Sequence, residues 1–275
     1  MGISKRTLPI YLSLMFASIY TAFPLYWLFS SALKSLPEYL QVPPLIFPLH
    51  PTLENFAQVL FAENLTIYFW NSAYIASVST IISVMLGSLS GYGFSRFKFP
   101  LSNYLFLFIL VTRMIPFTSL VIPFFLLMRN YGLLDTHIAV ILAHLTFQLP
   151  YAVWMMASFF QEMPQEYEEA AWLDGCSRIG VLFRIVIPIA SPAMIATSIF
   201  CFIWSWNEFV FAVTLTQSTL SKTLPVRIYE WITPYYSLWG PMFASGVLAS
   251  LPVLLLSLAL QKYFAKGLLL GTRYR

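Results

Sequence analysis

The sequence predicts an all-α integral membrane protein with six transmembrane helices. Of its 275 residues, 59% are hydrophobic and only 9% are charged, and the mean hydropathy is +0.75. A soluble domain carries about a quarter charged residues, so this composition is typical of a polytopic membrane protein. Two further observations support this class: apolar segments long enough to cross a bilayer, and an uneven distribution of Lys and Arg along the chain.

The expected spans follow from segment length. About 20 apolar residues are needed to cross a hydrocarbon core of ~30 Å, and helices are required because lipid offers no partner for unpaired backbone groups. The first apolar stretch is too long for a signal peptide, so we expect it to be retained. No repeat or linker is visible, so residues 1–275 are expected to form one transmembrane domain. The expected spans are residues 8–33, 67–93, 104–128, 138–160, 191–215 and 241–263.

Lys and Arg residues concentrate on one side of these spans. With the N-terminus inside, ten fall in inner segments and four in outer segments, and Arg113 falls inside a span. Because Lys and Arg are enriched in cytoplasmic loops, both termini are expected to be cytoplasmic. The inner residues are Lys5, Arg6, Arg96, Lys98, Arg178, Arg184, Lys262, Lys266, Arg273 and Arg275, and the outer ones are Lys34, Arg129, Lys222 and Arg227.

One inner segment, residues 162–190, is acidic although apolar sequence lies on both sides of it. Pro164 suits the first position of a helix, where a missing N–H costs little. Glu166, Glu168 and Glu169 then fall in or near the first turn, where the helix dipole favours negative charge. We therefore expect a short acidic helix at the start of this segment.

A turn and a second helix are expected to follow. Gly175 suits a helix C-terminus because it adopts positive φ without strain. Ser177 suits the N-cap of a second helix over residues 178–187. Pro188 and Pro192 are expected to end this helix or to bend it into the fifth span.

An acidic helix is unusual at this face of a membrane. The cytoplasmic surface is negative, and helices that lie on it favour Lys and Arg. A protein partner with basic or donor groups would explain the acidic residues, and Ala170 and Ala171 would allow it to approach closely. The alternative from the residues alone is a solvated connector whose charges keep it out of the lipid.

Several motifs resemble those of one known family. The run Glu169-Ala170-Ala171, followed by Asp174-Gly175 and the Ile185 to Pro188 stretch, resembles the EAA–G signature of permease subunits of binding-protein-dependent ABC importers. About residues 25–275 resemble the shorter permease of the maltose-type carbohydrate branch. The stretches that carry this wider resemblance are "GYGFSRFKF" (91–99), "WSWNEFVFAVTLT" (204–216), "KTLPV" (222–226) and "KG" (266–267).

The resemblance implies a type I ABC importer permease fold, in which residues 162–190 form a cytoplasmic coupling helix for ATPase subunits. It implies a subunit that forms half of the pathway for a sugar or sugar-like solute. The alternative is a non-sugar solute such as a glycerol phosphate, a polyol or a glycosylated osmolyte. The implied ATPase-coupling residues are Glu166, Glu168, Glu169, Ala170, Ala171, Asp174 and Gly175.

Partners and cofactors follow from the same resemblance. It implies a heterodimer with a second permease, two ATP-binding subunits, and an extracytoplasmic sugar-binding protein, in the inner membrane of a prokaryote. The sequence contains no G-x-x-x-x-G-K-[ST] motif, so ATP and Mg are expected on the partner subunits rather than on this chain. We expect no bound cofactor, no catalytic or metal site, and no nucleic acid.

Candidates for the translocation pathway lie on two spans. Trp204, Trp206, Asn207 and Glu208 could line it, because aromatic faces pack on sugar rings and polar groups bind hydroxyls; the alternative is an interfacial aromatic belt. Arg113 is the remaining candidate, since a mid-membrane charge costs on the order of 3 kcal/mol and should face a cavity, a carbonyl or a partner helix. Pairing with Glu208 is a further alternative, although the depths estimated for the two residues differ.

Other features have narrower interpretations. Gly87 and Gly91 form a G-x-x-x-G pattern that favours close helix packing. His144 is interpreted as a hydrogen-bonded packing residue rather than a proton relay. The outer loop 217–225 could contact the binding protein, or it could be a plain connection between spans. The contact candidates in it are Ser218, Thr219, Leu220, Ser221 and Lys222.

Two other classes of membrane protein are disfavoured. A secondary transporter would place several ionisable groups near the midplane, often with repeat symmetry, whereas only Arg113 is expected there. A membrane enzyme would need a clustered acid, base or metal set. Three glutamates in one helical turn, without histidine, suit docking better than catalysis.

Overall fold

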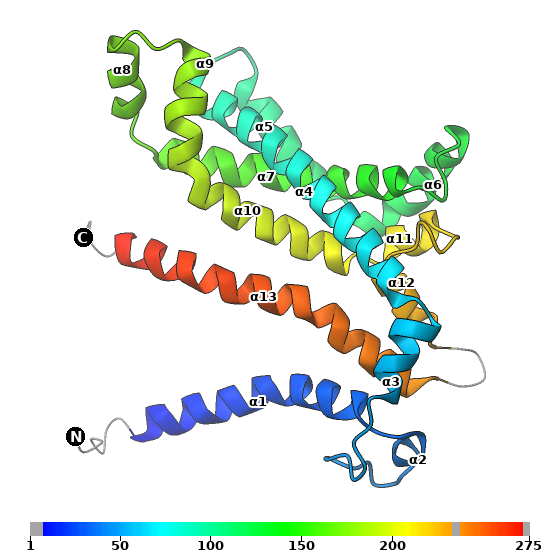
Figure 1. The fold of residues 1–275 in the computed structure, drawn as a ribbon. Helices are drawn as coiled ribbons and strands as arrows, with labels where there is room; N and C mark the ends of the chain where they lie inside the picture. The colour runs from blue at the N-terminus through cyan, green and yellow to red at the C-terminus, as the bar shows by residue number, and fades with distance from the viewer. Residues whose placement is uncertain (1–7, 233–236, 272–275) are drawn as a thin grey trace. The chain divides into compact units, whose positions relative to one another are not determined.

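The computed structural model describes residues 8–232 and 237–271, with side chains described up to Leu258. Lys5, Arg6, Arg273 and Arg275 lie outside these residues, as do the side chains of Lys262 and Lys266. The chain divides into two compact units, Met1–Thr66 with Arg227–Pro252, and Ile67–Val226 with Val253–Arg275. The single domain expected over residues 1–275 stays a prediction. Figure 1 gives the order of the helices along the chain.

The regular secondary structure of the described residues is helical, apart from an isolated bridge between Ile232 and Ser237, and irregular segments connect the helices. Five helices are long and apolar enough to cross a membrane, and a bent pair makes a sixth span if its halves are counted together. The all-α, six-span class is therefore confirmed. The five are α1 (Leu8–Ala32), α4 (Leu65–Arg96), α7 (His137–Glu162), the continuous run Arg178–Asn207, and α13 (Trp239–Gly271).

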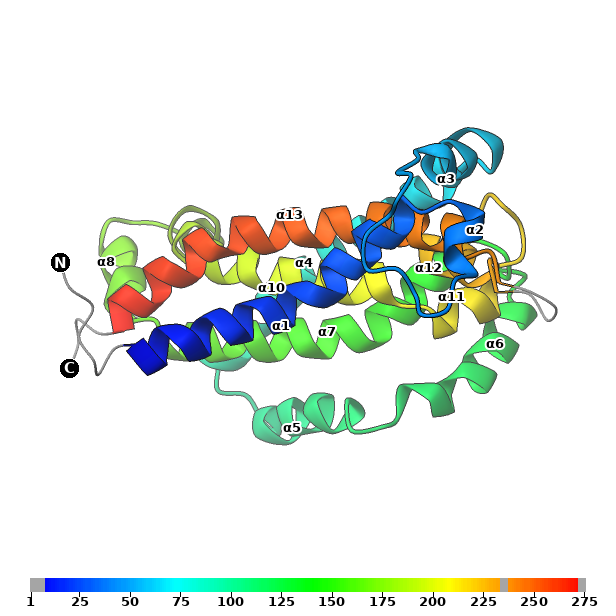
Figure 2. The same ribbon diagram turned by 90° about the horizontal axis from the view of Figure 1, so that it is seen from below.

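The third expected span, residues 104–128, is broken rather than continuous. It consists of α5 (Ser102–Thr112), a 3₁₀ turn (Phe117–Leu120) and α6 (Val121–Asn130), with a bend of 90° between the halves. Pro116 explains the break, because proline lacks the N–H donor and disfavours helical geometry in the residue before it. Figure 2 shows α5 and α6 as separate segments.

The fifth expected span, residues 191–215, is also interrupted. α10 (Ile187–Asn207) ends before Glu208, whose backbone is extended, and α11 (Val210–Leu215) follows. The sequence indicated that Glu208 lies on a continuous span. In the structure it lies at a break between two helices. This break exposes the first N–H groups of α11 to a side-chain acceptor.

Of the two alternatives expected for Pro188 and Pro192, the helix does not end at them but continues into the fifth span. α9 (Arg178–Val181) continues through a π-helical turn (Leu182–Val186) into α10, which contains both Pro188 and Pro192. A wider turn of this kind, directly before Pro188, changes the hydrogen-bonding pattern where a proline would otherwise clash with the preceding turn. The inner segment is therefore joined to the fifth span by unbroken helix.

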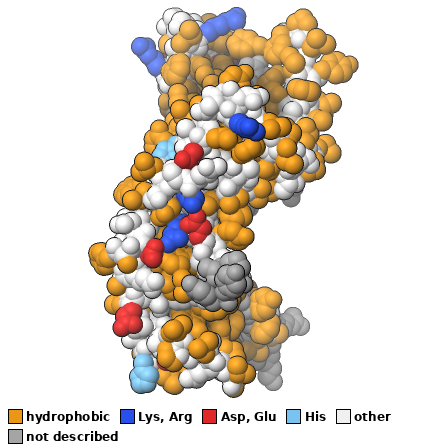
Figure 3. Space-filling view, turned by 90° about the vertical axis from the view of Figure 1, so that its right-hand side faces the viewer, with side chains coloured by type: hydrophobic (Ala, Val, Ile, Leu, Met, Phe, Trp, Pro, Cys, Tyr) orange, Lys and Arg blue, Asp and Glu red, His pale blue; other side chains and the backbone are white. Residues whose placement is uncertain are grey.

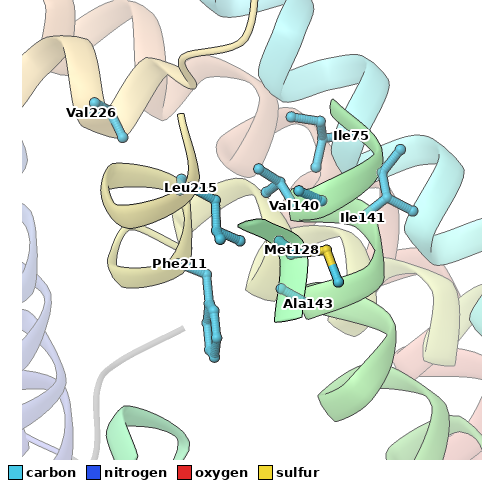
Figure 4. Packing of buried hydrophobic residues seen from close by; sticks show 10 residues of the cluster. Ile75, Met128, Val140, Ile141, Ala143, Phe211, Leu215 and Val226 are labelled. Atoms are coloured by element: carbon cyan, nitrogen blue, oxygen red, sulfur yellow. The ribbon is translucent and has the colours of Figure 1, made fainter. Parts of the chain in front are cut away.

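A hydrophobic cluster of the larger unit packs α11 against α4, α6 and α7. Figure 4 shows Phe211 and Leu215 of α11 beside residues of α6 and α7. These side chains fix α11 even though it is only one and a half turns long. The labelled members are Ile75, Met128, Val140, Ile141, Ala143, Phe211, Leu215 and Val226.

The G-x-x-x-G pattern packs against α7, as expected. A Cβ atom on Gly87 would lie 2.6 Å from the Cβ of Ala152, and one on Gly91 would lie 2.7 Å from the backbone nitrogen of Ala157. Neighbouring Gly93 has no such neighbour within 4 Å. Gly87 and Gly91 thus allow the backbones of α4 and α7 to approach closely.

In the smaller unit, the Pro-rich segment after α1 is organised by Glu38. Its carboxylate accepts N–H bonds from Ser35 (3.1 Å), Leu49 (2.8 Å) and His50 (3.0 Å). Burial would raise the pKa of Glu38, but these hydrogen bonds outweigh it and lower the pKa below its usual value. The short helices of this unit are α2 (Leu36–Tyr39), α3 (Glu54–Ala57) and a π turn (Gln58–Ala62), and α12 (Leu224–Tyr229) spans the boundary between the units.

Large apolar side chains remain exposed on the spans. Phe16 and Tyr20 of α1, for example, are 71% and 74% exposed. Figure 3 shows one side of the molecule, where hydrophobic side chains cover much of the surface and charged ones are few. Exposed apolar surface of this extent is expected where lipid or further subunits cover the protein.

We predict that Gly91→Leu lowers the thermal unfolding midpoint of the purified protein, because the new side chain would collide with the α7 backbone. Overpacking of this kind costs about 1–3 kcal/mol. Gly93→Leu is the matched control, since the space around Gly93 is open. Equal midpoints for the two variants would show that α4 and α7 are not in close contact.

Candidate coupling segment and translocation cleft

The acidic segment begins with α8 (Glu166–Leu173), which starts two residues, or about half a turn, later than the expected start at Pro164. Gly175 ends it with φ of +83°. Its N–H donates to the carbonyl of Trp172 (3.0 Å), and the next N–H, of Cys176, donates to the carbonyl of Ala171 (3.0 Å). A Cβ at Gly175 would meet nothing within 4 Å. Glycine is therefore required by backbone conformation, as predicted, and not by packing.

Ser177 starts the second helix, also as predicted. Its Oγ accepts the N–H of Gly180 at 3.2 Å, and α9 begins at Arg178. Because α9 continues into α10, α8 is joined to the fifth span through one tight turn. In Figure 1, α8 and α9 lie at the end of the larger unit away from α6 and α11.

The predicted coupling residues fall into two sets. Glu166, Glu169, Ala170, Asp174 and Gly175 are exposed, so they form an outward face. Leu173 on the same helix is 90% exposed and adds an apolar side chain to this face. The other two predicted residues, Glu168 and Ala171, are buried.

Glu168 is held in an ion pair inside the protein. Its Oε1 accepts from Nε of Arg96 at 2.7 Å, and its Oε2 accepts from the Tyr92 hydroxyl at 2.7 Å. The side chains of Arg96 and Glu168 are only 7% and 2% exposed. The expectation that all three glutamates would face a partner is therefore corrected: Glu168 is committed to α4.

Arg96 also binds the end of α7. Its two terminal nitrogens donate to the carbonyls of Phe160 (2.6 Å) and Met163 (2.9 Å). One guanidinium thus joins the ends of α4 and α7 to α8. Sequence reasoning used Arg96 only for orientation. The one sequence feature that could have pointed to a further role for Arg96 is its place in the "GYGFSRFKF" stretch, which resembles the family.

A second site is a cleft of about 610 Å³ between α7, α10 and the break that follows α5. Its wall is mainly aromatic, and the polar groups on it are few. Residues that line it include Arg113, Phe117, Phe147, Gln148, Tyr151, Phe200, Trp204, Asn207 and Glu208. All of them belong to the larger unit.

The cleft brings together most of the predicted pathway residues. Arg113, Trp204, Asn207 and Glu208 line it. Trp206 does not: it is 2% exposed and packs against Phe69, with 5.2 Å between ring centroids. Alternate residues of a helix point to different sides, so the WSWNE run could not place both tryptophans on one wall.

Glu208 is fixed by a buried network at the helix break. It accepts the N–H groups of Phe211 (2.8 Å) and Ala212 (3.2 Å) at the start of α11. It also accepts from Nε2 of His144 at 3.2 Å. With that proton assigned to Nε2, Nδ1 of a neutral ring accepts from the Ser205 hydroxyl at 2.6 Å. His144 is fully buried, which agrees with its interpretation as a packing residue.

Arg113 and Glu208 share the cleft but form no ion pair in the described part of the chain. The Arg113 guanidinium instead lies over the Tyr151 ring, 5.1 Å from its centroid. The depths estimated from helix length had placed the two residues apart. The breaks in both spans account for the difference, because neither residue lies in the middle of a straight helix.

The outer loop that follows α11 is held by Asp135. Its Oδ1 accepts the N–H groups of Gln217 (2.7 Å) and Ser218 (2.8 Å) and the hydroxyl of Ser221. Burial would raise the pKa of Asp135, but these hydrogen bonds lower it well below its usual value. Of the predicted contact residues, Thr219 and Leu220 are exposed, Ser218 and Lys222 are half-buried, and Ser221 is buried. The exposed part of the loop is therefore its tip.

We predict that Glu168→Gln lowers the unfolding midpoint much more than Glu169→Gln. Removing one charge of a buried ion pair costs on the order of 3 kcal/mol, whereas Glu169 is exposed. Both substitutions remove one carboxylate from the same helix, so net charge and position are matched. Thermal unfolding of the two purified variants is the measurement. Equal midpoints would mean that the Arg96 pair does not hold α8.

We predict that Asp135→Asn loosens the outer loop. Because the pKa of Asp135 is lowered, its stabilising contribution is present above the ordinary pKa and is lost only as the pH falls through the lowered value. The variant should therefore show faster amide exchange at Gln217 and Ser218 at neutral pH. Asp174→Asn, which removes an exposed carboxylate elsewhere, serves as the control. Unchanged exchange in Asp135→Asn would contradict this role.

Comparison with known proteins places the chain in a family. The model of the binding-protein-dependent transport system inner membrane component matches residues 83–269. The trehalose/maltose transport system permease protein MalG of Thermococcus litoralis is 33% identical over 97% of this chain and 96% of that protein. The sulfoquinovosyl glycerol transport system permease protein SmoH of Agrobacterium fabrum is 31% identical, over 90% and 87%.

The fold has a match among solved structures. A chain from the crystal structure of a bacterial ABC transporter involved in the import of the acidic polysaccharide alginate aligns with a TM-score of 0.79 at 22% identity, covering 96% of this chain and 99% of that one. The family match, the two permease relatives and the shared fold agree with the EAA–G signature. The chain therefore belongs to the binding-protein-dependent transport system inner membrane components, and it is a membrane-spanning permease subunit of an ABC importer.

Proposed function

We propose that this permease subunit forms half of the pathway for a sugar or sugar-like solute, and that separate ATPase subunits drive it by docking on α8. The observation that carries the proposal is the division of α8 into two faces. The outward face presents Glu166, Glu169 and Leu173. The inward face is tied to α4 and α7 through Glu168.

A partner docked on this face could transmit its motion to the membrane helices. A partner that binds the exposed carboxylates moves α8, and α8 is bound firmly at two places. The ion pair with Arg96 carries the motion to α4 and α7, and the Gly175 turn carries it to the fifth span. Since two rigid connections constrain the helix, little of its displacement is lost in local bending.

The aromatic cleft supports a sugar as the transported solute. Trp204, Phe147 and Tyr151 line it, and aromatic faces of this kind pack on sugar rings. The names of the two permease relatives also refer to sugars or a sugar derivative. We further propose a second permease subunit as partner, an extracytoplasmic binding protein that contacts the loop tip at Thr219 and Leu220, and cytoplasmic termini. In this arrangement ATP and Mg bind to the ATPase subunits.

We predict that Gly175→Asp and Glu169→Lys each lower uptake at least tenfold in the assembled complex. Aspartate at φ of +83° costs about 1–2 kcal/mol and would distort the turn. Lysine reverses the charge of the docking face. Glu54→Lys, on an exposed residue of α3, makes the same charge change elsewhere. The measurement is binding-protein-dependent uptake, together with ATP hydrolysis, in proteoliposomes.

The two variants also separate docking from folding. Loss of uptake together with loss of ATPase co-purification, at an unchanged unfolding midpoint, is the result expected for a docking face. Normal uptake and normal sugar-stimulated ATP hydrolysis in both variants would contradict the coupling role of α8.

A further inference from the structure

The cleft contains a cation that belongs to a membrane span. Arg113 directly follows α5 and lies at the break between the two halves of the bent pair that counts as the sixth span. A charge placed here is costly and therefore needs an anionic or dipolar partner.

Three other polar side chains of the cleft have partners of their own. Gln148 donates to the carbonyl of Cys201 (3.1 Å) and accepts from the Ser83 hydroxyl (3.2 Å). The Asn207 amide nitrogen donates to the carbonyl of Ile203 at 2.7 Å. Glu208 accepts from His144 and from the first N–H groups of α11. Among the described residues, no hydrogen bond or ion pair joins these side chains to Arg113.

Within the described part of the chain, the Arg113 guanidinium makes one cation–π contact. It lies over the Tyr151 ring; it has no hydrogen bond or ion pair with a described residue. The side chain is exposed to the cleft. Stacking on an aromatic face orients the planar guanidinium and leaves its N–H donors at the edge free for an incoming acceptor.

We infer that Arg113 binds an acidic substituent of the transported solute, so that the permease favours sugars that carry a carboxylate, sulfonate or phosphate group. This inference rests on the proposed function and names the substrate class for the same cleft. A guanidinium forms paired hydrogen bonds with planar or tetrahedral oxyanions. The aromatic wall, with Trp204 and Phe147, receives the ring of the same molecule.

The two parts of the cleft therefore have separate tasks. The aromatic side chains provide contact area that any sugar can use. Arg113 provides a charge that only an acidic sugar can neutralise. A neutral sugar in the cleft would cover the guanidinium without pairing its charge, and a donor that is covered and left unpaired is penalised. Discrimination then resides in one residue and can be tested by replacing it.

The test is competitive uptake by the complete complex in proteoliposomes with its binding protein. The probe is a mixture of neutral disaccharides and their uronic-acid, sulfonated and phosphorylated counterparts, and internalised sugars are quantified by mass spectrometry. The variants are Arg113→Gln and Arg113→Lys. Arg129→Gln is the control, because it removes the same charge from an exposed residue that does not line the cleft. The unfolding midpoint of each complex checks assembly.

The expected result is that the wild-type complex accumulates acidic sugars in preference to neutral ones. Arg113→Gln should lower the acidic-to-neutral ratio roughly tenfold, as expected for loss of a charged hydrogen bond. Arg113→Lys should retain part of the preference, and Arg129→Gln should not change it.

Two results would overturn the inference while leaving the proposed function intact. One is that the wild-type complex takes up neutral sugars alone. The other is that Arg113→Gln lowers acidic and neutral uptake equally, which would mean that Arg113 pairs with a second subunit. Uptake of neither class by the wild-type complex would contradict the proposed function and this inference together.

Discussion

The buried ion pair between Arg96 and Glu168 is the interaction on which the position of α8, the proposed coupling helix, depends. A short helix joined to the membrane only by its two chain ends would tilt under load. Arg96 prevents this because it binds Glu168 on α8 and also the last carbonyls of α7. Such a pair stabilises only when its remaining hydrogen-bonding groups are satisfied. Here the Tyr92 hydroxyl and the two carbonyls satisfy them.

Two helix breaks determine which groups line the cleft. Continuous spans would present only their side chains to a cleft. The break before Pro116 leaves Arg113 beside Tyr151, and the break after Asn207 lets Glu208 cap α11. Irregular backbone at membrane depth is tolerated where it lines a cavity or is buried in protein.

Sequence reasoning predicted the features that depend on local chemistry. Composition and segment length predicted the spans, and Gly175 and Ser177 predicted the turn, because backbone preference decides these positions. It did not predict the role of Glu168, since burial of one glutamate among three depends on Arg96, 72 residues away. The break at Glu208 was missed for a similar reason: hydropathy does not register a carboxylate whose partners are His144 and backbone N–H groups. Trp206 was misplaced because its neighbour Phe69 lies on another helix.

The rigid attachment of α8 to α4 can be measured directly. Spin labels at Tyr167 and Gly93, in a variant with Cys176 and Cys201 replaced by serine, would report the distance between the two helices in the assembled transporter. Tyr167 is exposed and is not one of the proposed docking residues, and there is open space beside Gly93. If the ion pair holds α8, the distance distribution should be narrow and identical without nucleotide and with bound ATP. A distribution that broadens or shifts on ATP binding would show that α8 moves independently of α4, which would contradict the account.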